Sequence, residues 1–246
     1  MLTLMVGLAH ARAIPLGNPV RTAETGLVEL QAVGGATTDP VDVVSACDSD
    51  EGNCSAAAYV RSGTFRLNLR PVDVLGVWAD FGWHVDAVTA LSHRATITTA
   101  PAAGLHLAWP GKGFRPAVSV RGSLLTSQNA EVDDDTDEVS VTSEHRALQV
   151  DAALLGAWGA SAGGINVWAG PIAAVYDDHS VVDLETSTDV AMELDSSLPV
   201  GLAIGGEAIS DKIGSPWKPR SARVSTGLEF RMIDAWGVSA WMGIGW

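Results

Sequence analysis

Two residues of one predicted strand have side chains that suit acid–base chemistry. His84 and Asp86 are two positions apart, so in an extended strand their side chains point to the same side. His93 follows in the next segment, beside a serine. A hydrolase needs Ser, His and an acid to meet in space, and the spacing alone does not show that they meet. The favoured interpretation is a polar network of His84 with Asp80 and Asp86, and a hydrolase is the alternative.

A second candidate site is the acidic run Asp133–Glu138. Clustered carboxylates bind Ca²⁺, but this run lacks the glycine and the terminal glutamate spacing of an EF-hand loop. A solvated acidic loop is therefore the interpretation that we favour, with a divalent-cation site as the alternative. The glycine pairs at 34–35 and 163–164 have no predicted helix after them and do not indicate a phosphate-binding loop. We predict neither a metal nor another cofactor.

The two cysteines, Cys47 and Cys54, lie seven residues apart in one acidic segment. In an oxidising compartment this spacing allows a disulfide, which we predict. Two cysteines with no nearby histidine make a poor zinc site.

The charge of the chain is concentrated in a few segments. The 246 residues have a formal net charge of −14, and 19 of the 29 Asp and Glu lie in residues 36–61, 126–145 and 177–196. This acidity argues against nucleic acid as a partner. No window contains the ~18 uncharged apolar residues that a membrane helix requires.

Apolar and polar residues alternate over ten segments, and a period of two is typical of β-strands. These segments are 26–34, 64–70, 75–86, 104–109, 114–124, 148–158, 165–176, 198–204, 224–232 and 236–246. Short turns at 71–74, 110–113 and 159–164 alternate with long predicted loops at 36–61, 87–101, 126–145 and 177–196. The short 233–236 and the long 209–220 depart from this rhythm. We predict a single all-β domain, an antiparallel barrel of about ten strands, with eight or twelve as alternatives.

The polar faces of these strands are rich in arginine and acid, which we expect to pair inside a narrow lumen. The predicted luminal network consists of Arg66, Arg70, Asp80, His84, Asp86, Arg115, Arg121, Asp151, Arg223, Glu229 and Arg231. The apolar faces would then contact lipid. A soluble barrel or sandwich, with the apolar faces inside, is the alternative.

The last strand resembles the C-terminal strand of bacterial outer-membrane β-barrel proteins, which alternates and ends in an aromatic residue. Its apolar face includes Trp236, Val238, Met242, Ile244 and Trp246, although the usual last residue in that class is Phe. The resemblance extends over most of the chain and identifies no subfamily. It implies a barrel inserted by the barrel-assembly machinery into outer-membrane lipid.

The first 13 residues resemble a secretory signal, with a short apolar stretch ending in Ala11-Arg12-Ala13. The basic residues that usually precede such a stretch are missing, and a short buried strand is the alternative. If the signal is cleaved, residues 14–246 form the barrel.

These patterns favour a small integral outer-membrane protein without catalytic activity. We expect it to act as a structural or interaction component through its acidic extracellular loops, with an envelope protein as a further partner. We do not expect a wide porin, because small barrels are nearly filled by side chains. A narrow channel for small solutes is the first alternative. An outer-membrane hydrolase that uses His84 and Asp86 is the second.

Overall fold

The computed structural model describes the greater part of the chain. The described residues are 15–20, 28–43, 54–88, 96–99, 101–111, 113–132, 139–159, 164–183, 188–191, 200–210, 222–233 and 235–246. Of these, only the backbone is described for 38–43, 54–60, 84–88, 96–99, 125–132, 139–147, 176–183, 188–191 and residue 235.

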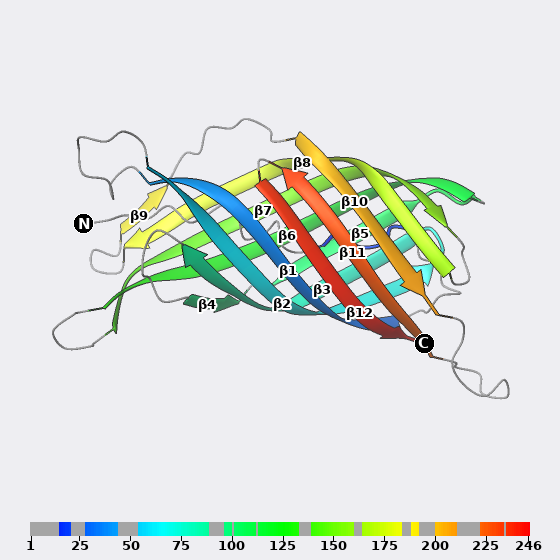
Figure 1. The fold of residues 1–246 in the computed structure, drawn as a ribbon, viewed down its shortest axis with the longest axis horizontal. Coiled ribbons are helices and arrows are strands. Elements are labelled where there is room, and N and C mark those ends of the chain that lie inside the picture. Colours follow the sequence, from blue (N-terminus) through cyan, green and yellow to red (C-terminus); the bar gives the residue numbers. More distant parts are fainter. Residues whose placement is uncertain are drawn as a thin grey trace.

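The described chain is almost entirely β-strand (Figure 1). The strands are β1 (Val28–Val43), β2 (Cys54–Val72), β3 (Leu75–Val88), β4 (Thr96–Thr99), β5 (Ala102–Ala108), β6 (Gly113–Val132), β7 (Val139–Gly159), β8 (Gly164–Asp183), β9 (Thr188–Ala191), β10 (Val200–Ile209), β11 (Arg223–Ile233) and β12 (Ala235–Gly245). In the described residues, no helix is long and apolar enough to cross a membrane.

The twelve segments form one closed antiparallel barrel of ten strands. Neighbouring strands pair in sequence order, and two further pairings, β1 with β12 and β8 with β10, close the ring. The short β4 and β9 add no position to it, because β4 pairs with β3 beyond β5, and β9 pairs with β8 beyond β10. The predicted ten-strand barrel is therefore confirmed, and eight or twelve barrel strands are excluded.

In most barrel strands the polar face points inward, and in all of them an apolar face points outward. Strand β11 alternates without interruption, and its neighbours Leu228 and Glu229 are 62% and 1% exposed, respectively. Alternation alone cannot decide which face is buried, since an inside-out barrel has the same period. The burial decides it, and the charged face lies inside.

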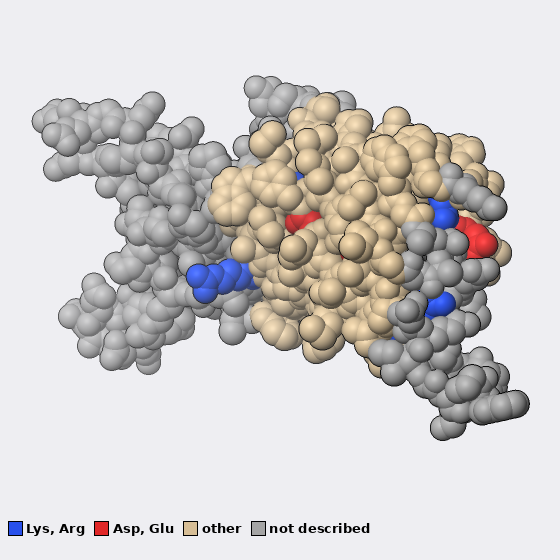
Figure 2. All heavy atoms as spheres, turned by 45° about the vertical axis from the view of Figure 1, so that its right-hand side comes forward, with Lys and Arg blue, Asp and Glu red and all other residues tan. Residues whose placement is uncertain are grey.

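The outward face of the described barrel is apolar. Figure 2 shows one side of it as a mostly uncharged surface. Only small charged spots interrupt the uncharged band in that view. Every barrel strand contributes to it, and its largest exposed side chains include Leu30, Phe65, Phe81, Trp83, Leu107, Trp109, Phe114, Leu124, Leu154, Trp158, Ile165, Val200, Leu228, Met232, Trp236, Met242, Ile244 and Trp246. Such an area far exceeds the few hundred Å² of apolar patch that a soluble monomer usually exposes.

The strands extend well into the segments predicted as long loops, and that prediction was wrong for much of each segment. Strand β1 continues to Val43 and pairs with Cys54, which begins β2, while β6 and β7 stay paired as far as Val132 and Val139. The β-branched residues of these segments favour strand pairing, and the acids between them masked that tendency. Much of the acid-rich sequence therefore lies on strand extensions at one end of the barrel.

The opposite end of the barrel holds the beginning of β1 and the end of the chain. The backbones of Val28 and Trp246 exchange hydrogen bonds of 3.3 and 3.0 Å there. The tight connection between β11 and β12, which departs from the predicted rhythm of turns, is present: β11 ends at Ile233 and β12 begins at Ala235. Because the number of barrel strands is even, β1 begins and β12 ends at the same end of the barrel.

Candidate functional site: the lumen of the barrel

Charged side chains converge in the lumen, which is the interior of the barrel. Among the described residues, six arginines and five carboxylates are buried there: Arg66, Arg70, Arg115, Arg121, Arg223, Arg231, Glu29, Asp80, Asp151, Glu207 and Glu229. The two signs nearly balance, as they must where charges are removed from water. The net charge of −14 therefore lies elsewhere on the chain.

The best-defined pair of the lumen joins Arg66 of β2 to Asp80 of β3. These residues are direct cross-strand partners, and the guanidinium donates two bonds to the carboxylate, Nε to Oδ1 and Nη2 to Oδ2, each of 2.7 Å. The charge lies 3.8 Å from the centre of the Trp78 ring, a cation–π contact. At 1% and 0% exposure, this is a fully buried bidentate ion pair.

Two more buried ion pairs line the lumen. Arg121 of β6 pairs with its cross-strand partner Asp151 of β7, whose other oxygen accepts a 2.7 Å bond from Gln149. On β11, Arg231 and Glu229 approach to 3.2 Å. Arg231 also interacts electrostatically with Arg66, Arg121 and Asp151. The three pairs therefore form one charge cluster that connects β2, β3, β6, β7 and β11.

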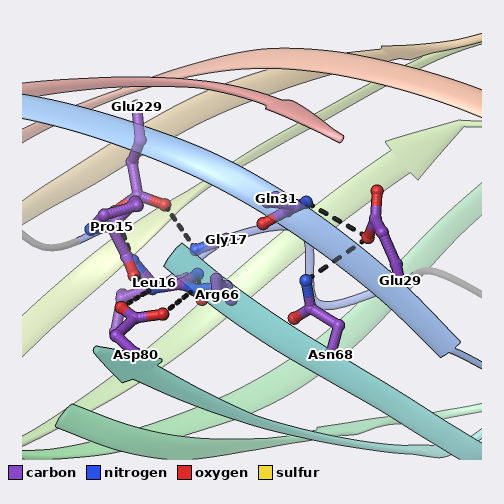
Figure 3. Close-up of polar contacts among 9 residues, drawn as sticks. All are labelled: Pro15, Leu16, Gly17, Glu29, Gln31, Arg66, Asn68, Asp80 and Glu229. Atoms are coloured by element: carbon purple, nitrogen blue, oxygen red, sulfur yellow. Dashed lines mark hydrogen bonds and ion pairs between the residues drawn. The ribbon is translucent and has the colours of Figure 1, made fainter. Parts of the chain in front are cut away.

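Glu29 joins the strands on either side of the closing strand β12. Its carboxylate accepts bonds from Gln31 (3.1 Å) and Asn68 (3.3 Å), as Figure 3 shows, and from the Ser225 hydroxyl on β11 (2.5 Å). Between them on β12 lies Gly243, where a Cβ atom would come within 2.6 Å of Glu29 Oε1 and 2.8 Å of Ser225 Oγ. The missing side chain at Gly243 therefore lets Ser225 of β11 donate a hydrogen bond to Glu29 of β1 across β12.

Glu207 is a luminal residue that the sequence reasoning missed, because it lies beyond the predicted end of its strand at residue 204. It accepts a 3.0 Å bond from the indole of Trp241 and a 2.8 Å bond from Asn18. The two glycines before it hid the alternation that could have extended the strand. Three inward tryptophans also lie against cross-strand glycines: Trp78 against Gly104, Trp168 against Gly205 and Trp241 against Gly227.

One side of the lumen is apolar, which the sequence reasoning did not predict. Leu155 of β7 and Trp168 and Ile172 of β8 are buried inside, together with alanines of β6, β7 and β10. Both faces of 165–176 are apolar, so alternation gave a weak signal in this segment. The lumen therefore combines a charged wall with an apolar wall.

Residues 15–20 lie inside the barrel. All six residues are buried, although none of them belongs to a strand. The sequence Pro15-Leu16-Gly17-Asn18-Pro19-Val20 has no alternation and falls outside the ten predicted strands. We call residues 15–20 the luminal segment.

The charged wall binds the backbone of the luminal segment (Figure 3). The two oxygens of Glu229 accept the N–H groups of Leu16 (2.7 Å) and Gly17 (2.9 Å). Arg66 donates to the carbonyls of Pro15 (2.6 Å) and Leu16 (3.4 Å).

Two more arginines extend this contact toward the end of the segment. Arg70 donates to the carbonyl of Asn18 (2.9 Å), and Arg115 donates to that of Val20 (3.3 Å). The Val20 N–H donates to the side chain of Asn18 (3.0 Å), which forms an Asx turn.

The other predicted site residues have mixed outcomes. Arg223 is buried, and the predicted outer face of the last strand, Trp236, Val238, Met242, Ile244 and Trp246, is exposed. His84 and Asp86 are backbone partners of Ser62 and Val60, but their side chains lie outside the described residues. The same holds for Cys54, and neither Cys47 nor Asp133–Glu138 is described. The disulfide and the acidic-loop interpretation therefore stay predictions.

The described lumen offers one arrangement that resembles part of a catalytic site. His106 Nδ1 lies 2.7 Å from Ser119 Oγ, the distance of a nucleophile–base pair. The charged neighbours of His106 are the cations Arg66 and Arg70 rather than an orienting carboxylate, and both members of the pair are buried. Among the described residues, no three metal-binding side chains gather.

No protein-family model matches the sequence, and no curated protein matches it. A solved structure described as the CymD monoaromatic hydrocarbon channel aligns with 99% of this chain and 97% of its own, at 8% sequence identity and a TM-score of 0.34. A likeness this remote carries no inference about what this chain binds.

Proposed function

We propose that the protein is an integral barrel of the bacterial outer membrane with a non-catalytic, structural or interaction role. The observation that carries the proposal is the inverted polarity of the closed barrel, with apolar side chains outside and paired charges inside. In lipid, a closed barrel satisfies every backbone group, and only an apolar outer face is compatible with the hydrocarbon core.

The acidic end of the barrel is the part that we propose acts on partners. Strands β6, β7 and β8 are 20, 21 and 20 residues long, whereas about 9–11 tilted residues cross a bilayer. Their surplus projects from the membrane at the acid-rich end. An envelope protein or surface with a basic patch is the partner class that this charge favours.

A narrow channel for small solutes is the second candidate. One observation favours it: the luminal segment occupies the lumen, belongs to no strand of the wall, and is bound there by side chains. The structure does not test the hydrolase that uses His84 and Asp86, because the side chains of both residues lie outside the described residues.

Membrane extraction and gel migration test the location. We expect the chain to stay with outer membranes in carbonate, to leave them in detergent, and to migrate faster unheated than heated. Release by carbonate, or identical migration before and after heating, would exclude the proposal.

Pull-down of the solubilised protein, with and without neutralising substitutions in 126–145, tests the role. A partner retained equally by both forms argues against the acidic end as the binding surface. Hydrolytic activity that His84→Ala abolishes would establish the enzyme instead.

A further inference from the structure

The luminal segment is bound in the manner of a ligand. Among the described residues, none of its backbone groups pairs with the backbone of a strand. Its hydrogen bonds to the barrel end on side chains, which include Glu229 and Glu207 on one side and Arg66, Arg70 and Arg115 on the other. Two consecutive N–H groups bind one carboxylate, and successive carbonyls bind guanidinium groups. This is the chemistry by which proteins capture a short peptide backbone.

The sequence of the segment fits this site. A buried backbone N–H group needs a hydrogen-bond acceptor, and Pro15 and Pro19 have no N–H group that needs one. Leu16 and Val20 pack in the apolar cluster that includes Trp168. Gly17 adopts φ +86°, and a Cβ atom there would lie 2.9 Å from Arg66 Nη1. Both the backbone and the side chains are thus complementary to the two walls of the lumen.

The wall leaves room for such a ligand. An eight-stranded barrel is just filled by its own side chains, and ten strands enclose more. Small residues at many inward positions, such as Ala117, Ala153, Ala157, Ala203 and Ser239, enlarge that space. With the segment in place, the charge cluster around Arg66 and Asp151 is almost without exposed surface. The luminal segment, which bonds to Glu229 and Arg66, therefore occupies the lumen beside this cluster.

We infer that the lumen is a binding site for a short peptide, that the luminal segment occupies it in cis, and that its release opens the barrel. The ligand class is an uncharged peptide that presents two adjacent N–H groups to Glu229 and carbonyls to Arg66, Arg70 and Arg115. The inference that the lumen binds a peptide depends only on the contacts in the lumen. The inference that release opens the barrel also rests on the proposed membrane location.

Peptide binding in detergent micelles tests the first part without a membrane. In the variant, a Gly-Ser repeat replaces residues 15–20. The probe is the peptide Pro-Leu-Gly-Asn-Pro-Val with an acetylated N-terminus and an amidated C-terminus, titrated by calorimetry. We expect saturable binding, none by a scrambled peptide, and none to the wild-type chain, whose site is occupied.

Glu229→Gln in the same background removes the charge and one acceptor, so affinity should fall about tenfold to a hundredfold. Asp73→Asn, an exposed carboxylate change in the β2–β3 turn, should leave the affinity unchanged. Absence of binding to a variant that still shows heat-modifiable migration overturns the inference, as does equal binding of the scrambled peptide.

Conductance in planar bilayers tests the second part. We expect the wild-type barrel to stay closed, the Gly-Ser variant to conduct, and the added peptide to block it. Gly17→Val, which displaces the segment without altering the wall, should also conduct and serves if the first variant fails to fold. A wild-type conductance equal to that of both variants shows that the segment is not a closure. If the peptide binds in micelles but the chain does not insert into bilayers, the proposed location fails and the binding site stands.

Discussion

Removal of one partner of the Arg66–Asp80 pair should strongly destabilise the barrel. In Asp80→Ala, the guanidinium loses both 2.7 Å bonds while it stays buried at 1% exposure. Breaking a buried ion pair by removing one partner typically costs about 3–5 kcal/mol, because it leaves a buried charge uncompensated. Arg66 keeps its contacts to the carbonyls of Pro15 and Leu16, so we expect the lower end, about 3 kcal/mol.

Unfolding in urea from lipid vesicles, followed by tryptophan fluorescence, measures this cost. Asp73→Ala is the matched control, since its exposed carboxylate should change the free energy of unfolding by no more than about 0.5 kcal/mol. The double variant Arg66→Met with Asp80→Ala leaves no unpaired charge. Its loss of stability should therefore be about 2 kcal/mol smaller than the sum of the losses in the two single variants. A loss below about 1 kcal/mol for Asp80→Ala, or additive single changes, would refute the reasoning, because the pair would then behave like a surface salt bridge.

Three further changes test other parts of the structure. Gly243→Val should prevent closure at β12, because a Cβ atom there comes within 2.8 Å of oxygens of Glu29 and Ser225. Gly122→Val is the control and should fold, because the space around Gly122 is open. Equal heat-modifiable migration of the two variants would contradict this prediction. Leu154→Arg, on the outer face at 59% exposure, should cost about 2–4 kcal/mol in vesicles, and a neutral effect there would argue against lipid contact. Cys47 and Cys54 should take up alkylating reagent only after reduction, as intact mass measures, and labelling of the unreduced protein would exclude the disulfide.

The strand pattern and the strand number were predictable because a barrel strand must alternate. In β3 the alternation of Leu75, Val77 and Ala79 with Gly76 and Trp78 is visible without any tertiary information. The strand ends were less predictable. Whether the acid-rich segments pair depends on whether a neighbouring strand continues beside them, which local composition does not reveal.

The luminal residues could be predicted only where alternation was clear. Asp80, Arg121 and Glu229 lie on strands with distinct faces, so their common inward side follows from the period of two. Glu207 follows two glycines, and Trp168 lies on a strand with two apolar faces. The local pattern at those two positions carries no information about direction.

What the sequence determined by itself is the class of fold: ten alternating segments and an apolar last strand follow from local periodicity. What only the tertiary structure decided is which face is inside, which charges meet and what fills the space between them. Arg66 and Asp80 are 14 positions apart, but Leu16 and Glu229 are 213 positions apart. Contacts over that separation depend on closure of the ring and on the space left by small residues around it. The luminal segment has no period of its own, and the lumen that binds it exists only once β12 has joined β1.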